Sequence, residues 1–229
     1  MHNKLLLEIC AFNVQACIIA DRSGAGRIEL CTDRKAGGTT PAYTTIKEAV
    51  GKTAIPIYPI IRPRGGDFFY NDEEYWMMIK SIEACKESGC AGIATGISLQ
   101  NGEIDTERLK QLVALAYPMK VTCHRVFDRT PDPFKALEDI IACGCERILT
   151  SGQANHAIDA TDTLTALVKA AGNRITIMPG AGVRASNIQQ LITETGAIEY
   201  HSTACTDNTE NINELELQDM LSILNKDRS

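Results

Sequence analysis

Short hydrophobic runs alternate with longer amphipathic segments along the whole chain. Eight of the short runs have the length and apolar content of buried β-strands, at residues 5–10, 27–31, 55–61, 92–96, 119–124, 147–150, 174–178 and 198–201. Segments with the apolar spacing of helices follow the strands, as at 72–88, 106–116, 133–143, 162–171, 185–194 and 213–224. This alternation predicts parallel strands that are joined by crossover helices.

The number of strand–helix units predicts that the sheet closes into a barrel. Eight units share 229 residues, which is roughly 28 residues each, and a TIM (β/α)8 barrel typically has about 250 residues. Glycines that suit the left-handed end of a helix precede four of the strands, at Gly24, Gly89, Gly144 and Gly196. We therefore expect an α/β TIM barrel, with residues 1–229 as a single domain. An open doubly wound α/β sheet is the alternative fold.

Composition narrows the classes of function. Hydrophobic residues make up 44% of the chain and charged residues 23%, which is typical of a globular protein, and the net charge is −6. The negative charge argues against nucleic-acid and anionic-lipid partners, and no apolar run approaches the roughly 20 residues of a membrane helix. The nine cysteines are odd in number and several lie in apolar runs, so we expect free thiols and a cytoplasmic protein.

Side chains alternate between the two faces of a strand, and this alternation places ionisable groups inside the predicted barrel. If the aliphatic residues of each strand face the helices, the inward set is Glu8, Cys10, Glu29, Cys31, His124, Glu199 and His201, whereas Arg125 faces outward. Buried carboxylates are costly unless they are paired, and Arg62 is the expected partner.

These groups lie at the carboxyl ends of the strands, where the active sites of TIM barrels lie. Because ionisable groups of both signs converge there, we favour a ligand site over an internal salt-bridge network that only fixes the barrel register. The candidate catalytic residues are Glu8, Glu29, Arg62, His124 and His201.

The loop after the third strand carries Arg62 and Arg64 on a stiff turn, followed by Gly65-Gly66 and the aromatic residues at 68–70. Two guanidinium groups can bind an anion, and the glycine pair can act as the hinge of an aromatic flap that excludes water. A simple turn whose aromatic residues pack on the barrel rim is the alternative interpretation.

The loop after the seventh strand, at 180–184, is rich in glycine, so its backbone N–H groups can point at an anion. Hydroxyl groups after the sixth and eighth strands lie on the same side of the barrel. A phosphate, carboxylate or sulfate-like group is the expected ligand, and tight turns without a ligand are the alternative. The candidate anion-binding residues are Arg62, Arg64, Ser151, Gly180, Gly182, Arg184 and Ser202.

Cys10 and Cys31 occupy equivalent positions on neighbouring strands, which lie about 4.8 Å apart in a sheet. Two thiolates at that spacing can select Cu(I) or Zn(II) over hard ions. The chain lacks C-x-x-C spacing, and buried cysteines are commonly inert, so packing alone is the other interpretation of this pair.

A set of motifs runs in order from the first strand to the eighth: LLEIC at 6–10, RIELC at 27–31, GGTTP at 37–41, PIIRPRGGDF at 59–68, CHRVFD at 123–128, LTSGQ at 149–153 and GAGVR at 180–184. Together these motifs resemble the CutC copper homeostasis family. The resemblance implies a cytoplasmic TIM barrel that handles copper. It also implies that Cys10 and Cys31 are the candidate Cu(I) ligands.

Two main hypotheses follow. In the first, the protein is a cytoplasmic copper homeostasis protein that binds Cu(I) through Cys10 and Cys31. In the second, it is a metal-independent enzyme for a small phosphorylated or carboxylated metabolite, in which Glu8, Glu29, His124 or His201 moves protons. A non-catalytic binding or scaffold role is a third hypothesis. The resemblance and the apolar helices also favour a homodimer or a higher homo-oligomer.

Overall fold

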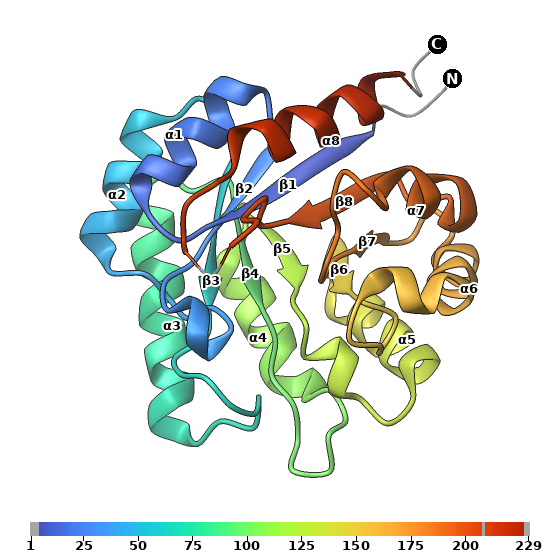
Figure 1. The fold of residues 1–229 in the computed structure, drawn as a ribbon. Coiled ribbons are helices and arrows are strands. Elements are labelled where there is room, and N and C mark those ends of the chain that lie inside the picture. Colours follow the sequence, from blue (N-terminus) through green and yellow to red (C-terminus); the bar gives the residue numbers. More distant parts are fainter. Residues whose placement is uncertain (1–4, 208, 227–229) are drawn as a thin grey trace.

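A computed structural model describes residues 5–207 and 209–226 of the chain and shows the predicted TIM barrel. In the described residues, eight parallel strands form one nearly closed sheet (Figure 1). The strands are β1 (Leu6–Ala11), β2 (Arg27–Leu30), β3 (Ile57–Ile61), β4 (Gly92–Thr95), β5 (Lys120–Cys123), β6 (Arg147–Thr150), β7 (Thr176–Pro179) and β8 (Glu199–Ser202).

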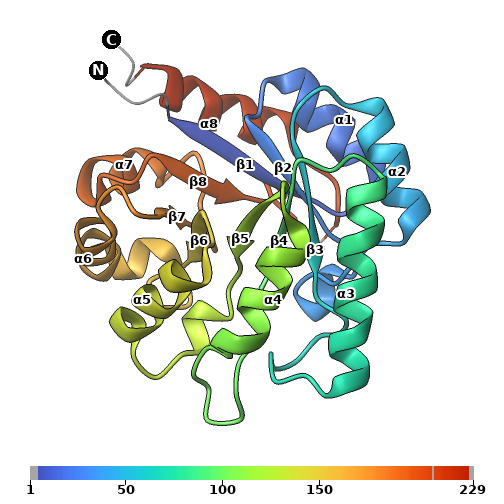
Figure 2. The same ribbon diagram turned by 180° about the vertical axis from the view of Figure 1, so that it is seen from behind.

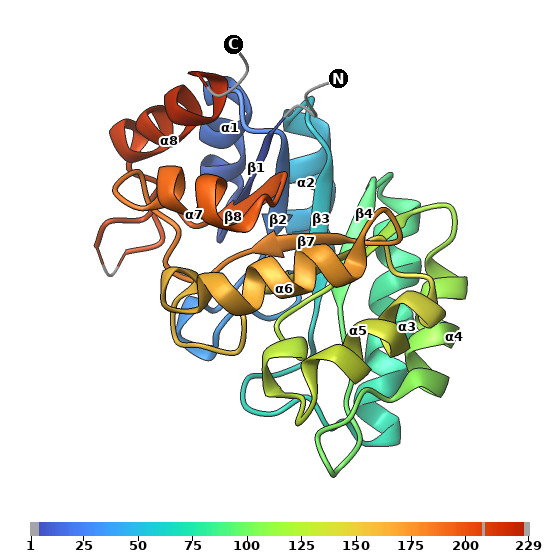
Figure 3. The same cartoon turned by 90° about the vertical axis from the view of Figure 1, so that its right-hand side faces the viewer.

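Eight α-helices surround the strands in the described part of the chain, and each packs against the next in chain order (Figures 1 and 2). In Figure 3, α8, α7, α6 and α5 succeed one another across the face turned toward the viewer. The helices are α1 (Val14–Ser23), α2 (Tyr43–Lys52), α3 (Asp72–Glu87), α4 (Thr106–Ala116), α5 (Pro133–Cys143), α6 (Thr161–Ala171), α7 (Ile188–Thr195) and α8 (Glu214–Lys226).

The sheet order confirms that the barrel closes. It runs β7-β6-β5-β4-β3-β2-β1-β8, so the last strand pairs with the first, with Glu8 opposite His201. At the remaining seam β7 and β8 lie against each other. The open doubly wound sheet is therefore excluded.

Local sequence signals account for the ends of several helices. The Asn71 side chain accepts a hydrogen bond from the Glu74 N–H, and the Glu74 carboxylate accepts one from the Asn71 N–H, which stabilises the start of α3. Gly24 and Gly144 end α1 and α5 with φ values of 91° and 87°, as their positions in the sequence predicted. The predicted start of α7 was three residues early, because Asn187 Oδ1 accepts the Arg184 N–H in a turn before the helix.

The apolar core lies between the strands and the helices. Outward residues of the strands, such as Leu7, Ile9, Ile28 and Ile61, are almost completely buried there. All nine cysteines are buried free thiols, as predicted. No helix in the described residues is long and apolar enough to cross a membrane.

Charged side chains fill the part of the barrel interior nearer the amino ends of the strands, since Arg27, Arg147 and Glu199 are the first residues of β2, β6 and β8. Arg27 forms ion pairs with both Glu8 and Glu199, and Arg147 Nε lies 3.0 Å from Glu199 Oε2. The ring of Tyr58 lies beneath both cations, with its centroid 5.2 Å from Arg27 Cζ and 5.5 Å from Arg147 Cζ. The interior therefore holds an internal salt-bridge network.

The prediction that Arg62 pairs with these carboxylates was wrong. Arg27 lies directly opposite Glu8 in the register of β1 and β2, whereas Arg62 follows the last residue of β3 and lies nearer the barrel mouth. The Arg62 guanidinium donates instead to the backbone carbonyls of Ala36, Gly38 and Gly66.

Replacing Arg27 tests whether the inner network stabilises the barrel. Arg27→Met leaves the buried Glu8 and the partly buried Glu199 with too few cations, so the free energy of unfolding should fall by about 3–5 kcal/mol. Arg174→Met, which breaks an exposed pair with Glu138, is the matched control and should have little effect. Urea titration measures both variants, and equal losses would contradict a stabilising role for the network.

Candidate functional site

A cavity of about 260 Å³ opens at the carboxyl ends of the strands. Cys10, Glu29, Ile60 and His201 line it from β1, β2, β3 and β8, and the loops after most of the strands complete its wall. In a TIM barrel this is the end at which active sites are found. The cavity is therefore the candidate functional site.

Two thiols and a carboxylate form a compact cluster on the part of the wall made by β1 and β2. Cys10 Sγ and Cys31 Sγ are 3.5 Å apart, and with a Glu29 carboxylate oxygen they lie within 4.8 Å of one another. All three residues are buried. The hydrogen bond with Cys10 and burial raise the pKa of the Cys31 thiol well above its ordinary value. Removing the proton from this thiol therefore requires a compensating positive charge.

His201 from β8 completes this cluster. Its Nε2 lies 3.0 Å from Glu29 Oε2 and 3.8 Å from Glu8 Oε1. Burial alone would lower the pKa of His201, but hydrogen bonds to Cys10 and Glu29 and the charges of Glu29 and Glu8 raise it well above its ordinary value. Burial likewise opposes ionisation of Glu29, but its bond to His201 lowers the carboxyl pKa. The two residues therefore form an ion pair at neutral pH.

His124 lies just after β5 and has the opposite protonation behaviour. Burial, together with the positive charge of Arg62, lowers the pKa of His124 to about 3. Its Nδ1 accepts a hydrogen bond from the Val126 N–H at 3.2 Å, so the proton of the neutral ring is on Nε2. This Nε2 is buried and has no hydrogen-bond partner among the described residues. His124 is thus a fixed N–H donor on the cavity wall and not a proton acceptor.

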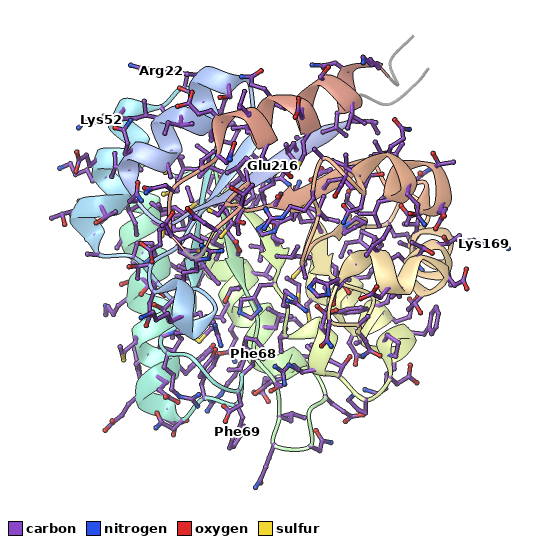
Figure 4. All side chains as sticks on the ribbon, viewed as in Figure 1. Arg22, Lys52, Phe68, Phe69, Lys169 and Glu216 are labelled. Carbon is purple, nitrogen blue, oxygen red and sulfur yellow. The ribbon has the colours of Figure 1, made fainter. Side chains whose placement is uncertain are left out.

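Arg62 lies close to His124 and is 5% exposed. It has no carboxylate within ion-pair distance in residues 5–207 and 209–226, and its charge is met by three backbone carbonyls. Phe68 packs against both residues, with its ring centroid 4.9 Å from the His124 ring centroid and 4.9 Å from Arg62 Cζ. Phe68 lies further inside the barrel than its exposed neighbour Phe69 (Figure 4).

The structure brings most of the predicted site residues to this cavity. The following line it: Cys10, Glu29, Cys31, Arg62, His124, Gly182, Arg184, His201 and Ser202. Glu8 lies beneath the cavity in the inner network. Gly180 is not part of the lining, but a Cβ atom there would lie 2.4 Å from Leu149 Cδ1 and 3.3 Å from His201 Nδ1. Glycine at 180 therefore lets the loop after β7 pass close to both side chains.

Two predicted anion-binding residues lie elsewhere. Arg64 is 38% exposed and pairs with Glu74 at 2.5 Å and Asp67 at 2.9 Å, outside the cavity. The Ser151 hydroxyl accepts a hydrogen bond from Arg125 Nη2 at 3.0 Å and donates one to the Ala154 carbonyl at 2.6 Å. The side chains of Arg64 and Ser151 are therefore already bonded to other groups of the protein.

Arg34 and Arg125 line the cavity but were not predicted as site residues, whereas Phe68, which also lines it, belongs to the segment predicted as an aromatic flap. Arg125 was expected to face outward, which was wrong because β5 ends at Cys123 and strand alternation does not continue into the following turn. The sequence could have indicated this turn, because Arg125 and Asp128 are three residues apart and can form an ion pair across it. Their Nε and Oδ2 atoms are 2.7 Å apart.

Comparisons with known proteins agree on one family. Residues 5–206 match the model of the CutC family. A family protein CutC of Parabacteroides distasonis is 48% identical over 202 residues, which cover 88% of this chain and 83% of that protein. A second family protein CutC, of Chromobacterium violaceum, is 47% identical over 199 residues, which cover 87% of this chain and 81% of that protein.

Solved structures give the same result for the fold. A crystal structure named as the copper homeostasis protein CutC of Streptococcus agalactiae has a TM-score of 0.83 and 38% identity, covering 87% of this chain and 98% of that one. Thiamine phosphate pyrophosphorylase of Pyrococcus furiosus has a TM-score of 0.66 and 12% identity, covering 98% of this chain and 97% of that one. This second likeness concerns the fold alone.

The lowered pKa of His124 predicts how stability depends on pH. An unfolded histidine takes up a proton below about pH 6.5, whereas folded His124 stays neutral down to about pH 3. The unfolded state therefore binds more protons in this window, and stability falls as the pH falls. Between pH 7 and pH 4, wild type should lose about 3 kcal/mol more than His124→Asn. Urea titrations at both pH values measure this difference, and equal losses would show that His124 is not held neutral.

Proposed function

Since this chain belongs to the CutC family, we propose that it acts in copper homeostasis by binding Cu(I) at the mouth of its barrel. The observation that carries the proposal is the pair of buried thiols, Cys10 and Cys31, whose sulfur atoms are 3.5 Å apart. The name of the related Streptococcus agalactiae protein supports the same role.

The chemistry of the cluster suits a soft monovalent ion. Thiolates favour Cu(I), whereas hard ions favour sites made of oxygen. A metal–thiolate bond is about 2.3 Å long, as it is for zinc, so sulfur atoms 3.5 Å apart could both bind one ion. Glu29 offers a carboxylate oxygen within 4.8 Å of both sulfur atoms.

Binding would couple to proton release. The raised pKa of Cys31 means that this thiol keeps its proton at neutral pH in the free protein. The thiol must lose that proton when it binds the ion, so affinity for Cu(I) should rise with pH.

Free thiols at all nine cysteines also suit the reducing cytoplasm, which we propose as the compartment. A homodimer or higher homo-oligomer stays a prediction.

A second candidate function is a metal-independent enzyme for a small phosphorylated or carboxylated metabolite. The observation that favours it is the number of cationic and N–H donor groups in the cavity, which include Arg62, Arg184 and His124. In that function the Glu29–His201 pair would hold or move a proton. His124 has a pKa of about 3, so it is a poor base at neutral pH. In this function it would polarise the substrate as a neutral hydrogen-bond donor.

Anaerobic Cu(I) titration against a competing chelator tests the first function. Wild type should bind one Cu(I) per chain in the cavity, and Cys10→Ala with Cys31→Ala should weaken binding by at least about 100-fold because both soft ligands are lost. The matched control is Cys85→Ala with Cys90→Ala, which removes another pair of hydrogen-bonded buried thiols away from the cavity. If the control loses Cu(I) affinity and the Cys10–Cys31 variant keeps it, the assignment is wrong.

A further inference from the structure

We propose that the same cavity has a separate site for a small oxyanion, the phosphate or carboxylate group of a metabolite, formed by Arg62, His124 and the loop at 181–184. This site does not depend on copper binding. The residues that form it are different from the thiols, and its ligand is an acceptor of hydrogen bonds and not a soft metal ion.

The charge of the cavity wall is the first observation. Four guanidinium groups line the cavity, those of Arg34, Arg62, Arg125 and Arg184. Glu29 is the single carboxylate among the described lining residues, and it is paired with His201. Of the four guanidinium groups, only that of Arg125 has a carboxylate partner within the described chain. The cavity thus has a large excess of positive charge, which attracts anions.

Burying the positively charged Arg62 without an anionic partner costs free energy. A buried guanidinium loses its hydration, and backbone carbonyls alone compensate that loss less well than a full negative charge does. Arg62 is 5% exposed, and its neighbours among the described residues are three backbone carbonyls and the Tyr70 hydroxyl, none of which carries a negative charge. An anion in the cavity would supply the missing charge.

Hydrogen-bond donors without partners are the second observation. Four buried side-chain N or O atoms have no partner among the described residues, and three of them belong to lining residues of this cavity: Arg62 Nε, His124 Nε2 and Arg184 Nη1. Buried polar groups in native proteins almost always have a partner. All three atoms are N–H donors, so the group that satisfies them must be an acceptor.

The backbone of the loop after β7 adds further donors. Ala181 and Gly182 adopt positive φ values of 73° and 74°, and a non-glycine residue such as Ala181 pays for this conformation in strain. The N–H groups at 181, 182 and 183 take part in no hydrogen bond within the described chain. Residues 181–183 also line the cavity, so these N–H groups are further donors for an anion bound there.

The donors and the cavity size define the ligand class. A phosphate group offers three acceptor oxygens and a carboxylate offers two, and both bind well to guanidinium groups. The cavity of about 260 Å³ lies just below the range of about 300–1,000 Å³ for drug-sized ligands. The cavity volume therefore favours a small metabolite.

Calorimetric titration of metal-free protein tests the site, with inorganic phosphate and malonate as probes and sodium chloride keeping the ionic strength constant. Wild type should bind at least one probe saturably. Arg184→Gln and His124→Asn should each weaken that binding by at least about tenfold, because the first removes a positive charge and both shorter amides withdraw their donors from the site. Arg64→Gln is the matched control, since it removes a cation near Arg62 but outside the cavity, and its affinity should equal that of wild type.

The outcomes separate the ligand classes and the two sites. Phosphate binding alone assigns a phosphorylated metabolite, and malonate binding alone assigns a carboxylated one. The proposal is overturned if neither probe binds saturably, or if Arg184→Gln and His124→Asn both bind as tightly as wild type. Arg62→Gln is not the primary variant, because Arg62 also holds three backbone carbonyls in place. Because the protein contains no copper in this titration, the result does not depend on whether Cu(I) binds.

Discussion

The ion pairs of Arg27 with Glu8 and Glu199 are the interaction on which the rest of the structure depends. A closed barrel must fill its interior, and β1 and β8 each place a carboxylate there. Arg27 comes from β2 and joins both carboxylates, while Arg147 comes from β6 and binds Glu199 from the other side of the interior. Strands that are far apart in the sequence are thereby held in one register. The network also fills the space below the cavity, so the polar groups nearer the strand ends surround a cavity of limited volume.

Above this network the cavity combines two kinds of chemistry. Soft thiols lie at the ends of β1 and β2, while cationic and N–H donors come from the loops after β3, β5 and β7. These two kinds of group support each other under the proposed function. Two thiolates on Cu(I) carry one net negative charge, and the positive charge of residues such as Arg62 and Arg184 reduces the cost of burying it. The same positive charge favours an oxyanion.

The sequence allowed the barrel and its closure to be predicted, because strand and helix segments alternate along the whole chain, and it identified about half of the residues that line the cavity. Strand phase alone placed Cys10 and Cys31 on the inside. Arg27 has the same phase as Glu29, so strand phase also predicts that Arg27 faces inward. Its pairing with Glu8 required the register of β1 and β2, which strand phase does not give. The free donors of Arg62 and Arg184 were not predictable, because they depend on which partners other loops bring within hydrogen-bond distance.

A crystal structure of the protein loaded anaerobically with Cu(I), and grown with phosphate, tests the central claim most directly. The account predicts an anomalous copper signal within bonding distance of both Cys10 Sγ and Cys31 Sγ. It also predicts a phosphate against Arg62, His124 and the 181–184 loop. Copper bound at other cysteines, together with a cavity that contains only water, would contradict it.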